Sequence, residues 1–302
     1  MIARFVSTLA ILLLVFTASR ALIYSLPGDP LDTLLAETGT SIPRAELREE
    51  LGLDRPFFKG LSQDLRHAVF QGDFGKSIFS REPVGKLVID RLRRTSLLAL
   101  CALALGLAFS LAVGLTSTGS REGRLARWTD HFCTAHGALA AALPTPWIGP
   151  ILLYVFAVAI PVFPLGGSLV LPSITLAFAF SGLWARLIRA RVRESLRFGA
   201  APGARALGVS EWKVVLKYGL APASGSLLAF LGTQIGSIFA GAFVTEVVFA
   251  WPGMGTLLID AVLKRDYPVV QAAIFFGAAF SLLGIWLGDA LQTWMDPRIR
   301  EK

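Results

Sequence analysis

The chain has 302 residues, of which 54% are hydrophobic and 17% are charged. Soluble domains carry roughly 45–50% apolar and about 25% charged residues, so this composition favours a membrane protein over a soluble globular domain. The net charge of +8 comes from basic residues in the gaps between long apolar runs, which predicts contact with membrane lipid and no binding of nucleic acid.

Six apolar segments are long enough to be membrane spans, because a helix needs about 20 mostly apolar residues to cross the hydrocarbon core. The fourth is the shortest, and the basic segment after it is a candidate for its extension. A cleaved signal peptide is the alternative for the first segment, but its apolar stretch is longer than a usual signal core. The predicted spans are residues 5–26, 96–117, 133–160, 169–184, 226–245 and 270–291.

The distribution of Lys and Arg predicts the orientation of these spans. The loops between spans two and three and between spans four and five are basic, as is the C-terminal tail, whereas residues 161–168 carry no charge. Short basic loops stay on the cytoplasmic side, so both termini should be cytoplasmic. Residues 27–94 should then be extracytoplasmic. The arginines near the end of this loop oppose that assignment, but the loop is longer than those for which the distribution of positive charge predicts orientation.

The long loop after the first span should form short helices on the outer face of the membrane domain. Residues 43–53 read as one helix. Residues 57–72 carry apolar side chains at near-helical spacing, namely Phe58, Leu61, Leu65, Val69 and Phe70. We therefore divide the chain into two parts. Residues 1–95 form an N-terminal transmembrane helix with its loop, and residues 96–302 form a five-helix transmembrane domain.

No catalytic or metal site is predicted. Residues 72–77 (Gly-Asp-Phe-Gly-Lys-Ser) look like the end of a phosphate-binding loop, but Phe70 stands where that pattern needs a glycine, so we predict a turn. His131 and His136 are five residues apart, which does not place two ligands on one helix face. No HExxH or GxSxG pattern occurs.

Polar residues in or just after the fifth span are candidates for the solute path. They are Gln234, Ser237 and Glu246, and polar groups within spans are costly and often functional. Gln234 and Ser237 share one helix face. Hydrogen bonding between helices is the alternative role for these side chains. Gly232 and Gly236 predict close approach of another helix.

The cytoplasmic segment 186–224 has a helical pattern in two pieces. Residues 204–207 are good helix formers, and Gly208 can end their helix by adopting positive φ. Ser210 can cap a second helix, in which residues 212, 215 and 216 (Trp, Val and Leu) share a face. This helix–turn–helix suits docking of a separate soluble protein, and an ordinary basic inner loop is the alternative.

Several short motifs, in order along nearly the whole chain, resemble the dipeptide, oligopeptide and nickel permease family of binding-protein-dependent ABC importers. Each motif alone is weak, but their order and the predicted topology fit together. They lie at residues 26–30 (LPGDP), 50–56 (ELGLDRP), 72–77 (GDFGKS), 204–209 (ARALGV), 246–255 (EVVFAWPGMG), 265–268 (RDYP) and 296–300 (DPRIR).

This resemblance implies an all-α membrane protein of six transmembrane helices, the type I ABC importer permease fold. A large extracytoplasmic loop would follow helix 1, and a cytoplasmic coupling helix would lie between helices 4 and 5. The implied ATPase-coupling residues are Ala204, Arg205, Ala206, Leu207, Gly208, Val209, Glu211 and Trp212.

The same resemblance implies the partners and the location. The chain would pair with a second permease subunit, similar or identical, in the inner membrane of a bacterium. Two cytoplasmic ATPase subunits would hold ATP and Mg, and an extracytoplasmic solute-binding protein would deliver peptides or related solutes. The chain itself would bind no cofactor and would not be an enzyme.

Three residues depart from the family pattern. Pro202 and Gly203 are unusual in the coupling motif and could shorten the first coupling helix, and Pro222 falls where the family usually continues helical. We expect transport by alternating access, driven by the ATPases. The rivals are a stand-alone secondary transporter, which would hold an ion site near the bilayer midplane, and a membrane enzyme.

Overall fold

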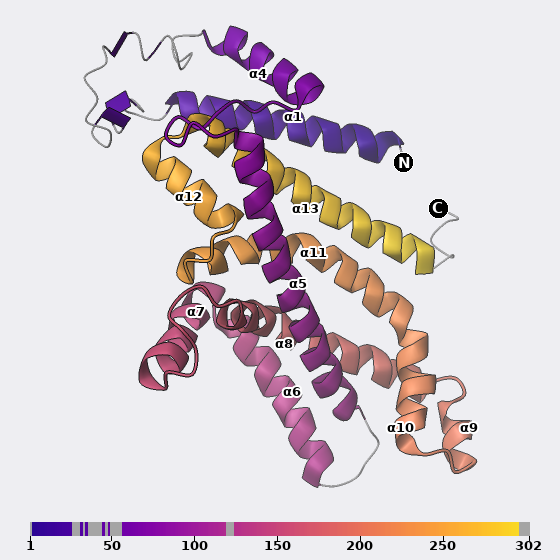
Figure 1. Ribbon diagram of the computed structural model, residues 1–302. Helices are drawn as coiled ribbons and strands as arrows, with labels where there is room; N and C mark the ends of the chain where they lie inside the picture. Colours follow the sequence, from indigo (N-terminus) through magenta and orange to yellow (C-terminus); the bar gives the residue numbers. More distant parts are fainter. Residues whose placement is uncertain are drawn as a thin grey trace. The chain divides into compact units, whose positions relative to one another are not determined.

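The computed structural model describes residues 2–25, 31–32, 34–35, 44–45, 48, 56–118 and 124–295. This described part is helical apart from short turns and an isolated β-bridge between Lys76 and Pro83, which confirms the all-α class. Two short segments, η1 and η2, have π-helical hydrogen bonding. The elements in Figure 1 are α1 (Ile2–Ser25), α4 (Phe57–Gln71), α5 (Val84–Thr116), α6 (Arg124–Ala142), α7 (Thr145–Leu153), η1 (Tyr154–Ala159), α8 (Val170–Arg197), α9 (Ala201–Ala206), α10 (Glu211–Val214), η2 (Val215–Leu220), α11 (Ala221–Val248), α12 (Met254–Lys264) and α13 (Tyr267–Met295).

Five helical stretches of the described residues are long and apolar enough to cross a membrane. They overlap the predicted first, second, fourth, fifth and sixth spans, with ends that differ by up to fifteen residues. The fourth continues through the basic segment, because α8 ends only at Arg197. The stretches are Phe5–Leu22, Val84–Thr116, Val170–Arg197, Glu211–Val248 and Tyr267–Ala290.

The predicted third span is not one continuous helix. α6 and α7 meet at a bend of 104°, so they make a sixth span only if the bent pair crosses the membrane as a unit. The break falls at Pro144, which has φ −62° and ψ 139° and precedes the first residue of α7. Proline lacks an N–H and disfavours helical geometry at the residue before it, so Leu143 cannot continue α6. Pro144 was visible in the sequence, and it ends the helix although the apolar segment continues beyond it.

The chain folds as two compact units, one of residues 1–95 with 252–282 and one of residues 96–251 with 283–302. The second unit is built around α8, which packs against α6, α7, α11 and η2. Of the membrane-spanning part of α8, 61% is buried, against 11% for α1. Trp184 of α8 lies in a core with Leu98 and Ala102 of α5 and Ile238 of α11.

Helices α11 and α13 approach each other very closely within the second unit. A Cβ atom on Gly232 would lie 2.5 Å from the Cα of Gly288. One turn away, a Cβ on Gly284 would lie 2.8 Å from Ile235 Cγ2 and 3.4 Å from the backbone N of Gly236. Only small residues permit such contact between helices, so the packing predicted from Gly232 and Gly236 is confirmed.

In the first unit, residues 72–77 form an irregular loop with a β-bridge at Lys76, and the turn follows at residues 78–80, just beyond the predicted position. Gly75 has φ +81°, and its carbonyl accepts a hydrogen bond of 3.0 Å from Val84 N. The buried Asp266 carboxylate accepts hydrogen bonds from Ser77 Oγ and, at 3.1 Å, from Ile78 N. Two motifs that are far apart in the sequence, at residues 72–77 and 265–268, are therefore joined in the fold.

The long loop after α1 is described mainly through α4, which confirms the helix predicted at residues 57–72. It ends at Gly72, which has φ +63°. The helix predicted at residues 43–53 lies outside the described residues except for isolated positions. The motifs at 26–30 and 296–300, and all of 50–56 but Pro56, also lie outside them. The predicted division along the sequence, into parts 1–95 and 96–302, stays a prediction. The compact units do not follow it exactly, because residues 252–282 pack with the first unit.

Candidate functional site

The motif at residues 204–209 forms a helix end of the Schellman type. Gly208 adopts φ +76°. Val209 N donates to Ala204 O at 3.1 Å, and Gly208 N donates to Arg205 O at 2.9 Å. These are the two bonds of that motif, and they satisfy carbonyl groups that the helix end would otherwise leave unpaired. The predicted turn at Gly208 is therefore confirmed.

An ion pair between Arg205 and Glu211 links the two ends of this turn. Arg205 Nε donates to Glu211 Oε2 at 3.1 Å, and Arg205 Nη2 donates to Glu211 Oε1 at 2.8 Å. These hydrogen bonds raise the pKa of Arg205 above its already high ordinary value, so the guanidinium stays charged. The fork geometry fits a carboxylate and fixes the direction in which α10 leaves the turn.

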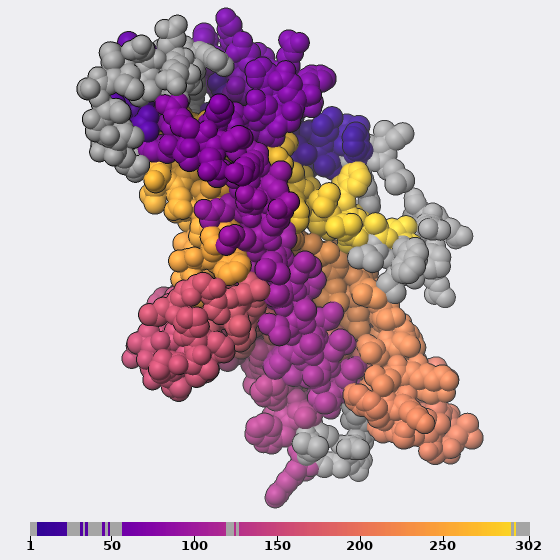
Figure 2. Space-filling model, viewed as in Figure 1, coloured from indigo at the N-terminus to yellow at the C-terminus, as the bar shows by residue number. Residues whose placement is uncertain are grey.

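The inner side of this helix–turn–helix belongs to a hydrophobic core. Ala201 and Ala204 of α9 and Val214 of α10 are buried against Val192 and Leu196 of α8. The outer side is exposed, with Leu207 at 85% and Trp212 at 55% of their maximal exposed area. Figure 2 shows α9 and α10 as a projection at one end of the second unit. We call residues 201–220 the coupling element.

Two details of the predicted coupling element are wrong. Ser210 precedes α10, but its side chain makes no capping hydrogen bond. Val215 is buried, whereas Trp212 and Leu216 are exposed, so these three do not share one face.

The prolines at both ends of the coupling element are accommodated by local structure. Pro202 lies in the first turn of α9, where the absent N–H removes no helical hydrogen bond. Pro222 lies in the first turn of α11, directly after η2. The π-type bond from Ala221 N to Leu216 O ends the preceding helix just before this proline. The helical path from Glu211 to Val248 therefore continues in spite of Pro222.

The three residues predicted for the solute path lie in different surroundings. Ser237 is exposed on α11 together with Thr233, and Gln234 is half-buried beside them. Glu246 is fully buried at the end of α11, so it lines no surface of the described structure. Its carbonyl accepts the hydrogen bond from Trp251 N, 2.8 Å long, of a second Schellman turn. In that turn the residue with positive φ is Ala250, at +49°.

Sequence reasoning missed an ionic cluster at the end of the second unit that also holds the coupling element. The Asp130 carboxylate accepts hydrogen bonds from Arg189 at 2.6 Å and from Arg193 at 2.7 Å. Arg193 also donates to the carbonyl of Ser117 at 2.6 Å. The cluster thus ties the end of α5 and the start of α6 to α8. The i, i+4 spacing of the two arginines was the available signal, but the sequence does not show which carboxylate they bind.

The two histidines of α6 are satisfied by hydrogen bonds. His136 Nε2 lies 2.9 Å from Ser181 Oγ, and His131 Nδ1 lies 2.7 Å from the carbonyl of Arg127. Among the residues that the structure describes, no group of three or more His, Cys, Asp or Glu side chains is arranged to hold a metal ion.

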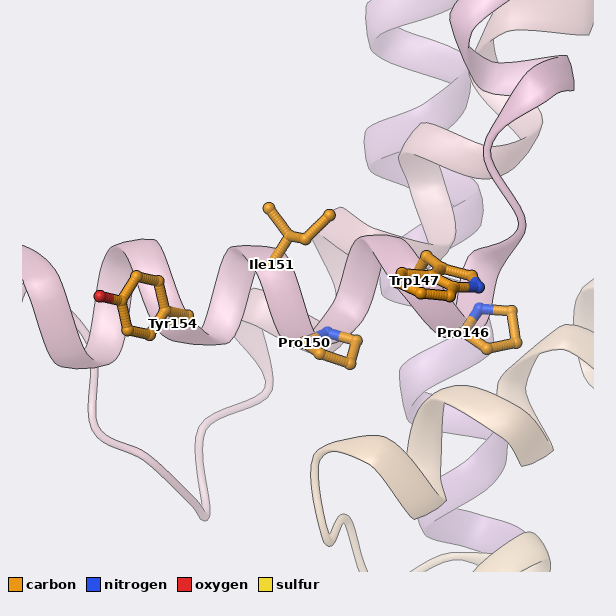
Figure 3. Close-up of a pocket in the computed structure, with 5 residues that line it drawn as sticks. All are labelled: Pro146, Trp147, Pro150, Ile151 and Tyr154. Atoms are coloured by element: carbon orange, nitrogen blue, oxygen red, sulfur yellow. The ribbon is translucent and has the colours of Figure 1, made fainter.

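An open apolar groove of about 510 Å³ runs along one side of α7 and η1. Figure 3 shows its lining side chains, Pro146, Trp147, Pro150, Ile151 and Tyr154, along a single helical run. Trp147, Ile151 and Tyr154 are exposed. Tryptophan and tyrosine are enriched where a protein meets the membrane–water interface, so this side of α7 is suited to lipid or to another membrane helix.

Comparison with known proteins identifies relatives of the whole chain. Residues 118–301 match the family described as the binding-protein-dependent transport system inner membrane component. The glutathione transport system permease protein GsiC of Salmonella paratyphi A is 33% identical over 305 residues, covering 99% of this chain and 98% of the relative. GsiC of Escherichia coli K12 is 34% identical over 307 residues, covering 100% and 98%.

A solved structure shows the same fold. The crystal structure of an amino acid ABC transporter with histidines superposes with a TM-score of 0.55, covering 69% of this chain and 94% of that chain. Its sequence is 19% identical, so the likeness concerns the fold alone.

Proposed function

Because the chain belongs to the family of binding-protein-dependent transport system inner membrane components, we propose that it carries small peptides of the glutathione type. The chain is the permease subunit of an ABC importer, a multi-pass inner-membrane protein and not an enzyme. The substrate class is a proposal that rests on the names of the GsiC relatives.

The coupling element is the observation that carries the proposed mechanism. Its inner side shares a core with α8 and α11, whereas its outer side exposes Leu207 and Trp212 to any partner. Contiguous exposed apolar patches mark interaction sites, and we propose that Leu207 and Trp212 belong to one such patch. We assign this surface to cytoplasmic ATPase subunits, which would hold ATP and Mg. Both chain termini would lie on the same side as this element.

A second permease subunit and a solute-binding protein complete the proposed assembly. The exposed side of α11 carries Thr233, Ser237 and Ala240, which are small or hydroxylated and leave room for a polar solute. We propose that this side, with Gln234, faces the path between two permease subunits. Glu246 would support the end of α11 from behind. Closure of the ATPases would shift the pair between inward-facing and outward-facing arrangements.

Substitution of one exposed leucine tests the docking surface. The chain is purified with its ATPase, second permease and binding protein, and glutathione uptake and ATPase content are measured. We expect Leu207→Ser to lose the ATPase subunits and uptake, because its side chain is 85% exposed and supports no core. Leu263→Ser is the control, since that side chain is 74% exposed on α12.

The outcomes separate the docking proposal, the transport mechanism and the substrate proposal. Loss of ATPase subunits in Leu207→Ser, with retention in the Leu263 control, supports docking at the coupling element. Wild-type ATPase content and uptake in Leu207→Ser would refute it. Uptake by the purified chain without ATP would instead support a secondary transporter. Uptake of another solute in preference to glutathione would overturn the substrate proposal and leave docking unaffected.

A further inference from the structure

Helix α4 has an apolar side that is only partly covered by protein. At 100° per residue, all of its apolar side chains except Phe70 form one continuous arc of about 120°; Phe70 is 81% exposed and lies about 100° beyond the arc. The inner part of this arc is half-buried, but Phe58 and Val69 at its edge are 81% and 66% exposed. The arc consists of Phe57, Phe58, Leu61, Leu65, Ala68 and Val69.

The position of α4 relative to the membrane follows from its contact with α1. The Asp64 carboxylate accepts a hydrogen bond from Arg20 of α1, whose guanidinium fits over Gly60 because that residue has no side chain. Arg20 lies two residues before the end of the apolar stretch Phe5–Leu22, which is about 3 Å along the helix. Asp64 is therefore held near the end of the apolar stretch of α1.

The exposed edge of α4 belongs to the same unit as α1, a helix with a large exposed apolar surface. Only 11% of the membrane-spanning part of α1 is buried in protein, and Leu14 and Leu22 are 68% and 57% exposed. Since α4 packs on this helix near the end of its apolar stretch, Phe58 and Val69 lie on an element that adjoins that end.

Two cations accompany the apolar edge. Lys59 and Arg66 are seven residues apart, which places both on the same side of α4 within about 100° of Phe58. Both side chains are exposed. Long basic side chains beside an apolar edge can bury their methylene stems while the charge reaches a phosphate.

We propose that α4 is an interfacial helix that places Phe58 and Val69 among the lipid chains at the Ser25 end of α1 and binds phospholipid phosphate through Lys59 and Arg66. This inference does not depend on the transported solute or on the coupling element. The occupant is lipid because α4 contacts α1 near the end of its apolar stretch and because the charges that flank the exposed edge complement phosphate.

Site-specific fluorescence quenching in the complete transporter tests this inference. Cys101 and Cys133 are first replaced by alanine, and single cysteines at Phe58 or Val69 are labelled with an environment-sensitive fluorophore. Matched controls are His67→Cys and Gln71→Cys, which lie on the polar side of α4 and are exposed. The transporter is placed in nanodiscs that contain doxyl-labelled phosphatidylcholine.

We expect doxyl lipid to quench the labels at 58 and 69 at least twofold more than the control labels, and aqueous iodide to show the reverse order. Equal quenching at all four positions, or stronger iodide quenching at 58 and 69, would overturn membrane insertion. Loss of lipid quenching when the solute-binding protein is added would assign the edge to that protein instead.

The phosphate contact has its own readout. In nanodiscs of phosphatidylglycerol and phosphatidylcholine, retention of labelled phosphatidylglycerol beside position 58 should fall severalfold in Lys59→Gln/Arg66→Gln. Arg81→Gln is the control at another exposed arginine of the first unit. Unchanged retention in the double variant would refute the phosphate contact, even if insertion of Phe58 is observed.

Discussion

Replacement of Gly219 by alanine perturbs the joint between the coupling element and the core of the second unit. A Cβ atom on Gly219 would lie 2.8 Å from Val192 Cγ1 and 3.1 Å from Leu196 Cδ2. Carbon atoms in contact are normally about 3.5–4.0 Å apart, so the shortfall at Val192 is about 0.7 Å. Val192 is fully buried, and its branched side chain has little freedom to turn away.

The expected size of the effect follows from this overlap. Inserting a methyl group into a well-packed core costs about 1–3 kcal/mol. The strain is relieved if η2 moves away from α8, and η2 connects α10 to α11. A penalty of about 1–3 kcal/mol on the productive position of the coupling element reduces its population by roughly 5–150-fold. We therefore expect both lower stability and less solute uptake per ATP hydrolysed.

Thermal unfolding in detergent and the ratio of uptake to ATP hydrolysis measure these two effects. Gly225→Ala is the matched control, because it lies in α11 and a Cβ there meets no atom within 4 Å. Alanine in a helix interior is favoured over glycine by roughly 0.5–1 kcal/mol, so this control should be slightly stabilised. The changes in stability should have opposite signs in Gly219→Ala and Gly225→Ala, which distinguishes overpacking from a general effect of alanine.

A second-site change makes the reasoning refutable. Val192→Ala removes the methyl group that a Cβ atom added at Gly219 would strike, so the double variant should be more stable than the sum of the single effects. Uptake per ATP should also recover in part. Additive effects in the double variant, or identical behaviour of Gly219→Ala and Gly225→Ala, would show that the close contact with α8 does not position the coupling element.

Ala250→Gly should raise the free energy of unfolding by about 1 kcal/mol, because Ala250 has φ +49° and glycine has no Cβ to strain there. The control Ala240→Gly within α11 should lower the free energy of unfolding. Equal effects of the two substitutions in thermal unfolding would contradict the prediction. Asp130→Asn should lower the free energy of unfolding by about 1 kcal/mol, because Arg189 and Arg193 of α8 lose their partly exposed carboxylate partner. The stability difference between this variant and the wild type should shrink at high salt. Gly232→Leu should prevent correct assembly of α11 on α13, seen as loss of monodisperse protein in size-exclusion chromatography, whereas normal elution would refute the close crossing.

Local features of the chain were readable from the sequence by itself. Long apolar runs specify membrane helices whatever their neighbours are, because the hydrocarbon core requires internally bonded backbone. The turn at Gly208 was predictable because glycine adopts positive φ without steric cost. The helix that became α4 and its end at Gly72 followed from the same local rules. Family membership was indicated by short motifs in the correct order.

Only the tertiary structure decided which apolar and polar side chains meet. Ala250 adopts positive φ without the glycine signal, because the packed end of α11 outweighs the local strain. Burial of Val215 depends on packing against α8, and burial of Glu246 depends on how α11 packs. The pairing of Asp130 with Arg189 joins residues 59 positions apart. Periodicity shows that a helix has an apolar side, but contacts distant in sequence decide what covers it, because packing depends on neighbours that the local pattern does not contain.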